Sequence, residues 1–203
     1  AEAYANAHLG ILKSNDSREN SFEVDAVTVN PFLGTDSVLP FIKLARKNGK
    51  GVFILVKTSN PSSKEIQDRK CNNKTIYQIV ANQVNKLGKD LIDKSGYSPI
   101  GAVVASTNPK ITNNLRSIMP NTYFLVPGFG AQRASLKNIA KCFNPNGYGA
   151  IVNSSRGITY AYNLSPWKEK YGTKHWECAV EEAVIRMNND LKEVTGKTRK
   201  KKS

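Results

Sequence analysis

The sequence contains few of the residues that build disulfide frameworks and metal centres. It has three cysteines, Cys71, Cys142 and Cys178, and two histidines, His8 and His175. An odd number of widely spaced cysteines argues against paired disulfides, and the two histidines are far apart in the sequence. We therefore expect no metal site, and the cysteine usage predicts a reducing, cytoplasmic location.

The sequence also lacks any hydrophobic run of the roughly 18 residues that cross a lipid bilayer, so we expect no membrane association. Its first residues, Ala1–Tyr4, include neither an initiator methionine nor the basic-then-apolar pattern of a signal peptide. This start is typical of a chain that begins within a helix.

Acidic residues are scarce: the chain has 16 Asp and Glu and 30 Lys and Arg, which gives a net charge of +14. Residues 197–203 carry five positive charges and no negative charge, and they predict a disordered basic tail after a domain of residues 1–196. The tail has no interleaved aromatic residues, and no predicted helix gathers Lys and Arg on one face. These features argue against nucleic acid as the partner and favour an anionic substrate.

Apolar runs of strand length alternate with helical patterns along the chain. The predicted strands are Val24–Val29, Gly51–Val56, Ile100–Ala105, Tyr123–Val126 and Ala150–Val152. The predicted helices are 38–46, 74–94, 111–119, 136–143 and 174–193, after an N-terminal helix over 1–12 and a polar loop over 14–21. This order predicts an α/β fold, either a doubly wound sheet or about the last five units of a (β/α)₈ TIM barrel.

Two strand-to-turn stretches predict a phosphate site. Thr122–Gln132 runs from an apolar strand into a turn rich in proline and glycine and ends on an amide. Such a turn presents backbone N–H groups, which suit an anion. Gly149–Ile158 repeats the design, with Arg156 and Gly157 opening a helix, where a positive charge is unfavourable unless an anion is bound. Because barrels hold phosphate at their last strands, this motif favours the barrel.

Four stretches together carry a likeness to a known family. Asp25–Gly34, Val56–Pro61, Phe124–Gln132 and Val152–Ile158 resemble, in order and in spacing, the bacterial second type of orotidine 5′-phosphate decarboxylase. The resemblance implies a (β/α)₈ barrel that forms a homodimer through its strand-end face. It also implies the loss of carbon dioxide from orotidine 5′-phosphate without a cofactor, which yields UMP in pyrimidine synthesis.

The resemblance implies a phosphate-binding role for three residues. Gln132 and Arg156 would hold the 5′-phosphate, helped by backbone N–H groups near Gly157. The guanidinium supplies a fixed fork of donors that fits phosphate oxygens. Arg133 and Ala134 stand where the family has glycines, and we expect Arg133 to point to solvent.

The resemblance assigns a second group of residues to the base and its carboxylate. Ser59, with Thr58 beside it, would read the pyrimidine edge, whereas Pro127 and Val126 would form an apolar wall beside the departing carboxylate. A local turn hydrogen bond is the alternative role for Ser59. Lys57 matches no catalytic residue of the family, and we expect it to face solvent or a neighbouring carboxylate.

One motif of the family is missing from the chain. The family's chemistry depends on an early-strand lysine and on Asp-x-Lys-x-x-Asp, which would lie before Ala1, and no stretch of the chain matches it. We therefore assign no catalytic residue and expect a truncated decarboxylase, or a split enzyme with a missing N-terminal segment, that is inactive alone. The alternatives are a non-catalytic phosphate- or nucleotide-binding α/β module that uses Gln132 and Arg156, and nucleic-acid binding through the tail.

Overall fold

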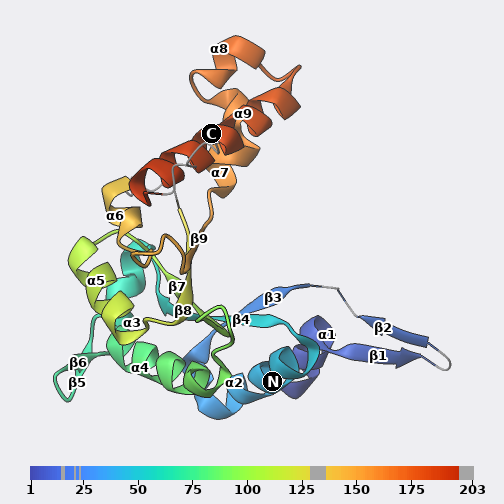
Figure 1. Ribbon diagram of the computed structural model, residues 1–203, viewed down its shortest axis with the longest axis vertical. Helices are drawn as coiled ribbons and strands as arrows, with labels where there is room; N and C mark the ends of the chain where they lie inside the picture. The colour runs from blue at the N-terminus through green and yellow to red at the C-terminus, as the bar shows by residue number, and fades with distance from the viewer. Residues whose placement is uncertain (15–16, 21, 23, 129–135, 197–203) are drawn as a thin grey trace.

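The structure is a computed structural model that describes residues 1–14, 17–20, 22, 24–128 and 136–196. Its centre is a parallel sheet of five strands in the order β3-β4-β7-β8-β9 (Figure 1). These strands are β3 (Ala26–Val29), β4 (Gly51–Lys57), β7 (Ser98–Val104), β8 (Thr122–Val126) and β9 (Ala150–Val152). Each strand pairs with the one that follows it in the chain, whereas a doubly wound sheet reverses its order at one point. The five predicted parallel strands are confirmed, and their order is that of a barrel.

Helices α2 (Thr35–Asn48), α4 (Ile76–Gly88) and α5 (Pro109–Ile118) follow β3, β4 and β7. Local residues fix their ends. The Asn108 side chain accepts hydrogen bonds from the N–H groups of Lys110 and Ile111, which satisfies two donors at the start of α5. Helix α2 ends at Gly49, whose φ of 65° is the left-handed conformation that glycine adopts without strain.

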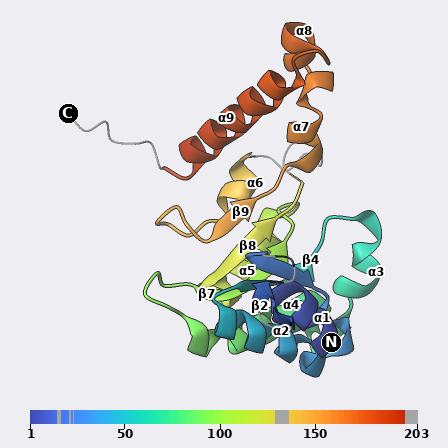
Figure 2. The same ribbon diagram turned by 90° about the vertical axis from the view of Figure 1, so that its right-hand side faces the viewer.

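One face of the sheet carries the hydrophobic core. On β4, the alternate residues Val52, Ile54 and Val56 are buried and join one cluster with side chains of α2, α4 and α5, such as Ile42, Val84 and Leu115. Burial of each such side chain contributes about 1.5–3 kcal/mol. Figure 2 shows α2 and α4 together beneath the sheet. The helices therefore fix the strands from this side.

The opposite face of the sheet is less covered. Leu55, Val103, Leu125 and Ile151 form a row across four strands, because each pairs with the next in the parallel register. Val103 in the middle of the sheet is 6% exposed, whereas Ile151 on the edge strand β9 is 49% exposed. In a closed (β/α)₈ barrel such a face surrounds the axis and is filled by layers of side chains. Five strands enclose that interior only in part.

The C-terminal elements extend away from the sheet (Figure 2). They are α6 (Leu136–Ala140), α7 (Ser155–Thr159), η4 (Ala161–Asn163), α8 (Trp167–Tyr171) and α9 (Trp176–Val194). Helix α9 packs against α6, α7, α8 and η4. Ala179, Ala183 and Met187 are its buried residues, and Ala179 and Ala183 pack around Ala161 of η4. The predicted last helix is confirmed, with a local packing partner.

Two predictions of local structure were wrong. The N-terminal helix predicted over 1–12 ends at Leu9 (α1, Glu2–Leu9), and residues predicted as its last turn and as a polar loop form the antiparallel hairpin of β1 (Ile11–Ser14) and β2 (Ser17–Asn20). The helix predicted over 74–94 ends at Gly88 and continues only as the 3₁₀ turn η3 (Lys89–Leu91). A Cβ at Gly88 would lie 2.6 Å from the Ser98 hydroxyl, so α4 approaches β7 closely there.

The remaining short elements are η1 (Pro31–Leu33), η2 (Pro61–Ser63), α3 (Lys64–Gln67), β5 (Lys70–Cys71) and β6 (Lys74–Thr75). The predicted tail, 197–203, lies outside the described residues. Among the described helices, none has the length and apolar character that crossing a lipid bilayer requires.

Candidate functional site

The C-terminal end of β4 is held by an ion pair. Leu55 pairs with Val103 and Lys57 with Val104, so a β-bulge inserts one extra residue into β4. As a result, both Val56 and Lys57 are buried. The Lys57 Nζ lies 2.7 Å from Oδ1 of Asp68 and 5.5 Å from the ring centre of Tyr77 on α4. The expectation that Lys57 faces a neighbouring carboxylate is confirmed.

Thr58 is tied to the segment that follows it. Its N–H donates to Oε1 of Gln67 at 3.0 Å, and its hydroxyl accepts from Nε2 of the same side chain at 2.9 Å. The hydroxyl also donates to Oδ1 of Asn60 at 2.6 Å. Ser59 is half-buried, and its side chain makes no hydrogen bond with the described residues. Of these two neighbouring hydroxyls, the one on Ser59 is therefore the more available to a ligand.

The ends of β8 and β9 are joined beyond their last residues. The N–H of Asn153 donates to the carbonyl of Val126 at 2.9 Å, and the N–H of Gly128 donates to the carbonyl of Asn153 at 3.1 Å. Gly128 has a φ of 86°, so the turn after Pro127 needs the conformational freedom of glycine. Pro127 is half-buried at this junction. Gln132 and its neighbour Arg133 lie outside the described residues.

Helix α7 begins directly after β9. Arg156 is exposed in its first turn, forms no ion pair with the described residues, and is followed by the half-buried Gly157. The N–H of Ile158 closes the turn on the carbonyl of Ser154 at 3.2 Å. The cation predicted to bind phosphate thus lies in the helix that follows a strand end, without a carboxylate partner in the described part of the chain.

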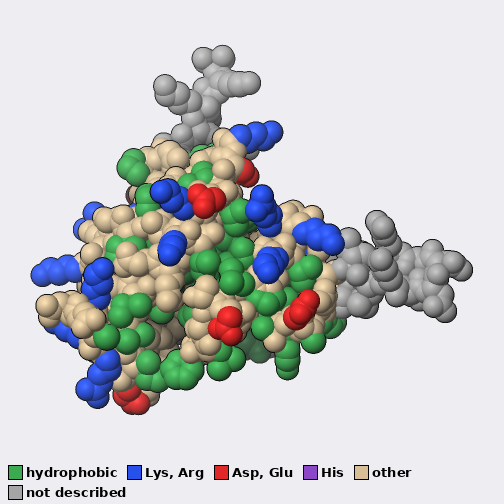
Figure 3. All heavy atoms as spheres, turned by 90° about the horizontal axis from the view of Figure 1, so that it is seen from below, with side chains coloured by type: hydrophobic (Ala, Val, Ile, Leu, Met, Phe, Trp, Pro, Cys, Tyr) green, Lys and Arg blue, Asp and Glu red, His purple; other side chains and the backbone are tan. Residues whose placement is uncertain are grey.

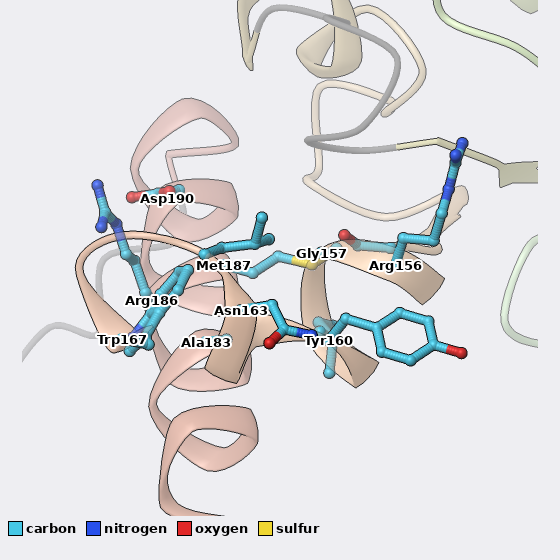
Figure 4. Close-up of a pocket in the computed structure, with 12 residues that line it drawn as sticks. Arg156, Gly157, Tyr160, Asn163, Trp167, Ala183, Arg186, Met187 and Asp190 are labelled. Atoms are coloured by element: carbon cyan, nitrogen blue, oxygen red, sulfur yellow. The ribbon is translucent and has the colours of Figure 1, made fainter. Parts of the chain in front are cut away.

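A cavity of about 450 Å³ lies between α7, η4, α8 and α9. Ile158, Leu164, Trp167 and Met187 give it an apolar lining, and the backbone of Arg156 contributes to its rim. Figure 4 shows that the side chain of Arg156 points away from Met187 and out of this cavity. The guanidinium of Arg156 therefore faces away from this cavity.

The structure brings the predicted residues to one edge of the sheet. Thr58 and Ser59 follow β4, Pro127 follows β8 and Arg156 follows β9, and the carboxyl ends of parallel strands lie at the same edge. No group of three or more His, Cys, Asp or Glu in the described ranges is placed to hold a metal ion. Across the sheet, a ligand would meet the hydroxyl of Ser59 after β4, the apolar Pro127 after β8 and the cationic Arg156 after β9.

The sequence profile of the orotidine 5′-phosphate decarboxylase / HUMPS family matches residues 13–169. The chain belongs to this family. The orotidine 5′-phosphate decarboxylase of Rhodopirellula baltica is 44% identical over 192 residues, which cover 95% of this chain and 63% of the relative. That of Caldicellulosiruptor bescii is 44% identical over 162 residues, which cover 80% of this chain and 53% of the relative.

Solved structures of the decarboxylase family share the fold. The structure of Leishmania donovani OMP decarboxylase matches with a TM-score of 0.66 and 27% identity, over 94% of this chain and 62% of that one. The five strands and their helices are thus part of a (β/α)₈ barrel. The chain spans between about half and two thirds of the length of these members of the decarboxylase family.

Two contact residues of this decarboxylase-family chain were missed by sequence reasoning. Gln67 lies in the four-residue helix α3, which is too short to give a periodic signal. The hydrogen-bond acceptors of Arg116 on α5 are backbone carbonyl groups, and no sequence pattern marks such acceptors. In the sequence, Gln67 is related to the strand end only by standing nine positions after Thr58.

Proposed function

We propose that this chain is the nucleotide-binding part of an orotidine 5′-phosphate decarboxylase, which releases carbon dioxide from orotidine 5′-phosphate and leaves UMP. The observation that supports the proposal most is the order of Ser59, Pro127 and Arg156 across the strand ends of a family member. In this proposal the catalytic lysine and carboxylates come from a segment outside the sequence given, and no cofactor takes part.

Each residue has a separate task in the proposal. The guanidinium of Arg156 and the N–H groups near Gly157 bind the 5′-phosphate together with Gln132, and the exposed side chain of Arg156, which forms no ion pair with the described residues, supports this role. The hydroxyl of Ser59, with Thr58 beside it, both donates to and accepts from the pyrimidine edge. Pro127 excludes water beside the carboxylate. Binding of the unreactive phosphate orders the strand ends around the base and so contributes to transition-state stabilisation.

Self-association through the strand-end face belongs to the same proposal. Phe32 and Leu33, in the turn after β3, are 76% and 80% exposed, and Ile66 of α3 is 57% exposed. A groove of about 590 Å³ runs between these two segments. Exposed apolar side chains of this size favour burial against another protein surface. Sedimentation of the chain and of Leu33→Asp tests the homodimer, because the charge at the interface would shift the chain to monomer.

Titration calorimetry with UMP and with inorganic phosphate tests the nucleotide site. We expect UMP to bind more tightly, and Arg156→Met to weaken UMP binding about tenfold to a hundredfold, as for lost charge-assisted hydrogen bonds. Arg46→Met, on an exposed position of α2, is the matched control and leaves binding unchanged. Release of carbon dioxide by this chain alone would contradict the assignment of the catalytic residues to another segment.

A non-catalytic phosphate- or nucleotide-binding module is the second candidate, and the exposed cation of Arg156 without a catalytic motif favours it. Equal and weak binding of UMP and phosphate would support that module. Nucleic-acid binding has less support, because Figure 3 shows Lys and Arg scattered among apolar and acidic side chains on the face it displays. We propose that residues 197–203 form a separate tail, so its deletion leaves UMP binding unchanged, and that the protein is cytoplasmic.

A further inference from the structure

The loop that carries Ser59 is held in place by side chains that reach back from the segment after it. The β-bulge at the end of β4 turns Lys57 toward Asp68, the residue directly after α3, and the two side chains pair at 2.7 Å. The carbonyl of Lys57 accepts from the N–H of Ala105 at 2.7 Å, which ties the same residue to the end of β7. The residue before Thr58 is therefore fixed on both its side chain and its backbone.

Gln67 fixes the next residue at two points. Its Oε1 accepts from the N–H of Thr58, and its Nε2 donates to the Thr58 hydroxyl. A glutamine amide is suited to this contact because it places a donor and an acceptor side by side on one rigid plane. The carbonyl of Thr58 is 3.4 Å from the Ser63 hydroxyl, a weaker third contact.

These contacts have a consequence for Ser59. The Thr58 hydroxyl has given its single proton to Asn60 and accepts from Gln67, so it has little capacity left for a ligand. The Ser59 side chain makes no hydrogen bond in the described part of the chain. In this loop Thr58 supplies the support and Ser59 is left to contact a ligand, a division of roles that suits a binding site.

We propose that Gln67 is a positioning residue, which holds the Thr58 backbone so that the Ser59 hydroxyl faces the pyrimidine edge of the nucleotide. The inference rests on the proposed function, because it takes Ser59 as the residue that reads the base. It goes beyond that function by assigning part of the base recognition to a side chain of α3 that does not touch the nucleotide.

The test compares two ligands that differ in the base. UMP and ribose 5-phosphate share the phosphate and the sugar, so the ratio of their dissociation constants measures what the base contributes. We expect Gln67→Leu to weaken UMP binding about tenfold, while ribose 5-phosphate binding changes less than twofold. Ser59→Ala should have the same effect, and the double variant should be no weaker than either single one, since both act on one contact.

Hydrogen exchange of the Thr58 amide gives a readout that needs no ligand. Gln67→Leu should speed this exchange, whereas Gln67→Glu keeps an acceptor for the Thr58 N–H and should restore both slow exchange and the preference for UMP. Asn113→Leu, which removes an exposed side-chain amide of α5 outside the groove beside α3, is the control and should alter neither.

The outcomes separate the inference from the function on which it rests. Faster exchange at Thr58 with an unchanged base contribution would overturn the positioning role and leave the nucleotide site intact. Unchanged exchange in Gln67→Leu would overturn the proposed anchor itself. Equal binding of UMP and ribose 5-phosphate by the unmodified chain would overturn the proposed function, and the assignment of Ser59 and Gln67 with it.

Discussion

Removal of the Arg116 guanidinium should destabilise the fold more than the loss of an ordinary surface arginine. The guanidinium lies 3.6 Å from the ring centre of Phe124 and donates to four carbonyl groups. The acceptors are Met119 at 2.9 Å, Thr122 at 2.8 Å, Cys142 at 2.6 Å and Gly149 at 2.7 Å. Arg116 thus joins the end of α5, the start of β8, the segment after α6 and the residue before β9.

The magnitude follows from the unmet carbonyl groups. Burial lowers the pKa of Arg116 to about 10, so the side chain is still charged at neutral pH. Arg116→Met removes one donor from each of the four carbonyl groups. Gly149 still accepts from the N–H of Phe124 at 2.8 Å and Met119 from that of Thr122 at 3.4 Å, and each carbonyl that is left dry and unpaired costs about 1–3 kcal/mol. Entry of water and local relaxation reduce the sum, so we expect a loss of about 3–5 kcal/mol, as for a broken buried charge network. This is a large part of the 5–15 kcal/mol that stabilises a typical domain.

Urea unfolding at pH 7, followed by circular dichroism, measures this loss. Arg116→Lys should fall between the unmodified chain and Arg116→Met, because a single ammonium group cannot reach all four carbonyls with the fork geometry of arginine. Arg46→Met removes an exposed arginine of α2 and should change the free energy of unfolding by less than about 0.5 kcal/mol. If Arg116→Met stayed within 1 kcal/mol of the unmodified chain, the reasoning would be refuted.

Three further predictions concern buried groups. Asp68→Ala should destabilise the fold by about 3 kcal/mol, because it leaves the charge of Lys57, whose side chain is 6% exposed, without its partner. Lys57→Met should cost about 1 kcal/mol, because the Asp68 side chain that it leaves unpaired is 34% exposed. The reverse order of the two losses in urea unfolding would contradict this. Burial raises the pKa of Cys142 to about 11, so a thiol reagent at pH 8 should modify this thiol only after unfolding. The free energy of unfolding should fall between pH 9 and 11, because the thiol ionises in the unfolded chain before it ionises in the folded one. Rapid modification of all three native thiols would contradict that burial. Gly101→Ala should cost about 1–3 kcal/mol because its Cβ would overlap the Phe53 ring, and Phe53→Leu in the same chain should recover part of it in thermal unfolding.

The sheet was predictable from the sequence because its strands are continuous apolar runs bounded by turn residues. Parallel strands buried by helices on one face and by a barrel interior on the other have this composition, and Gly51–Lys57 and Ser98–Val104 illustrate it. The hairpin of β1 and β2 was missed because its residues include several charged and polar side chains and no strong turn dipeptide.

The candidate site was predictable only in part. Turn chemistry identified the strand ends at Ser59, Pro127 and Arg156, since proline and glycine mark them directly in the sequence. The contacts of Gln67 with Thr58 depend on how a short helix folds back on a strand, which local sequence patterns do not encode. The role of Gln132 stays a prediction, because this residue lies outside the described part of the chain.

The central claim is that separate strand ends bind one nucleotide together, and amide chemical shifts measured during a titration with UMP test it most directly. We predict that the amides of Thr58 and Ser59 after β4 and those of Arg156 and Gly157 in α7 shift together, with a single dissociation constant. Inorganic phosphate should move only the α7 amides. Shifts confined to α7 with UMP as well, or different dissociation constants for the two groups of amides, would contradict a shared nucleotide site.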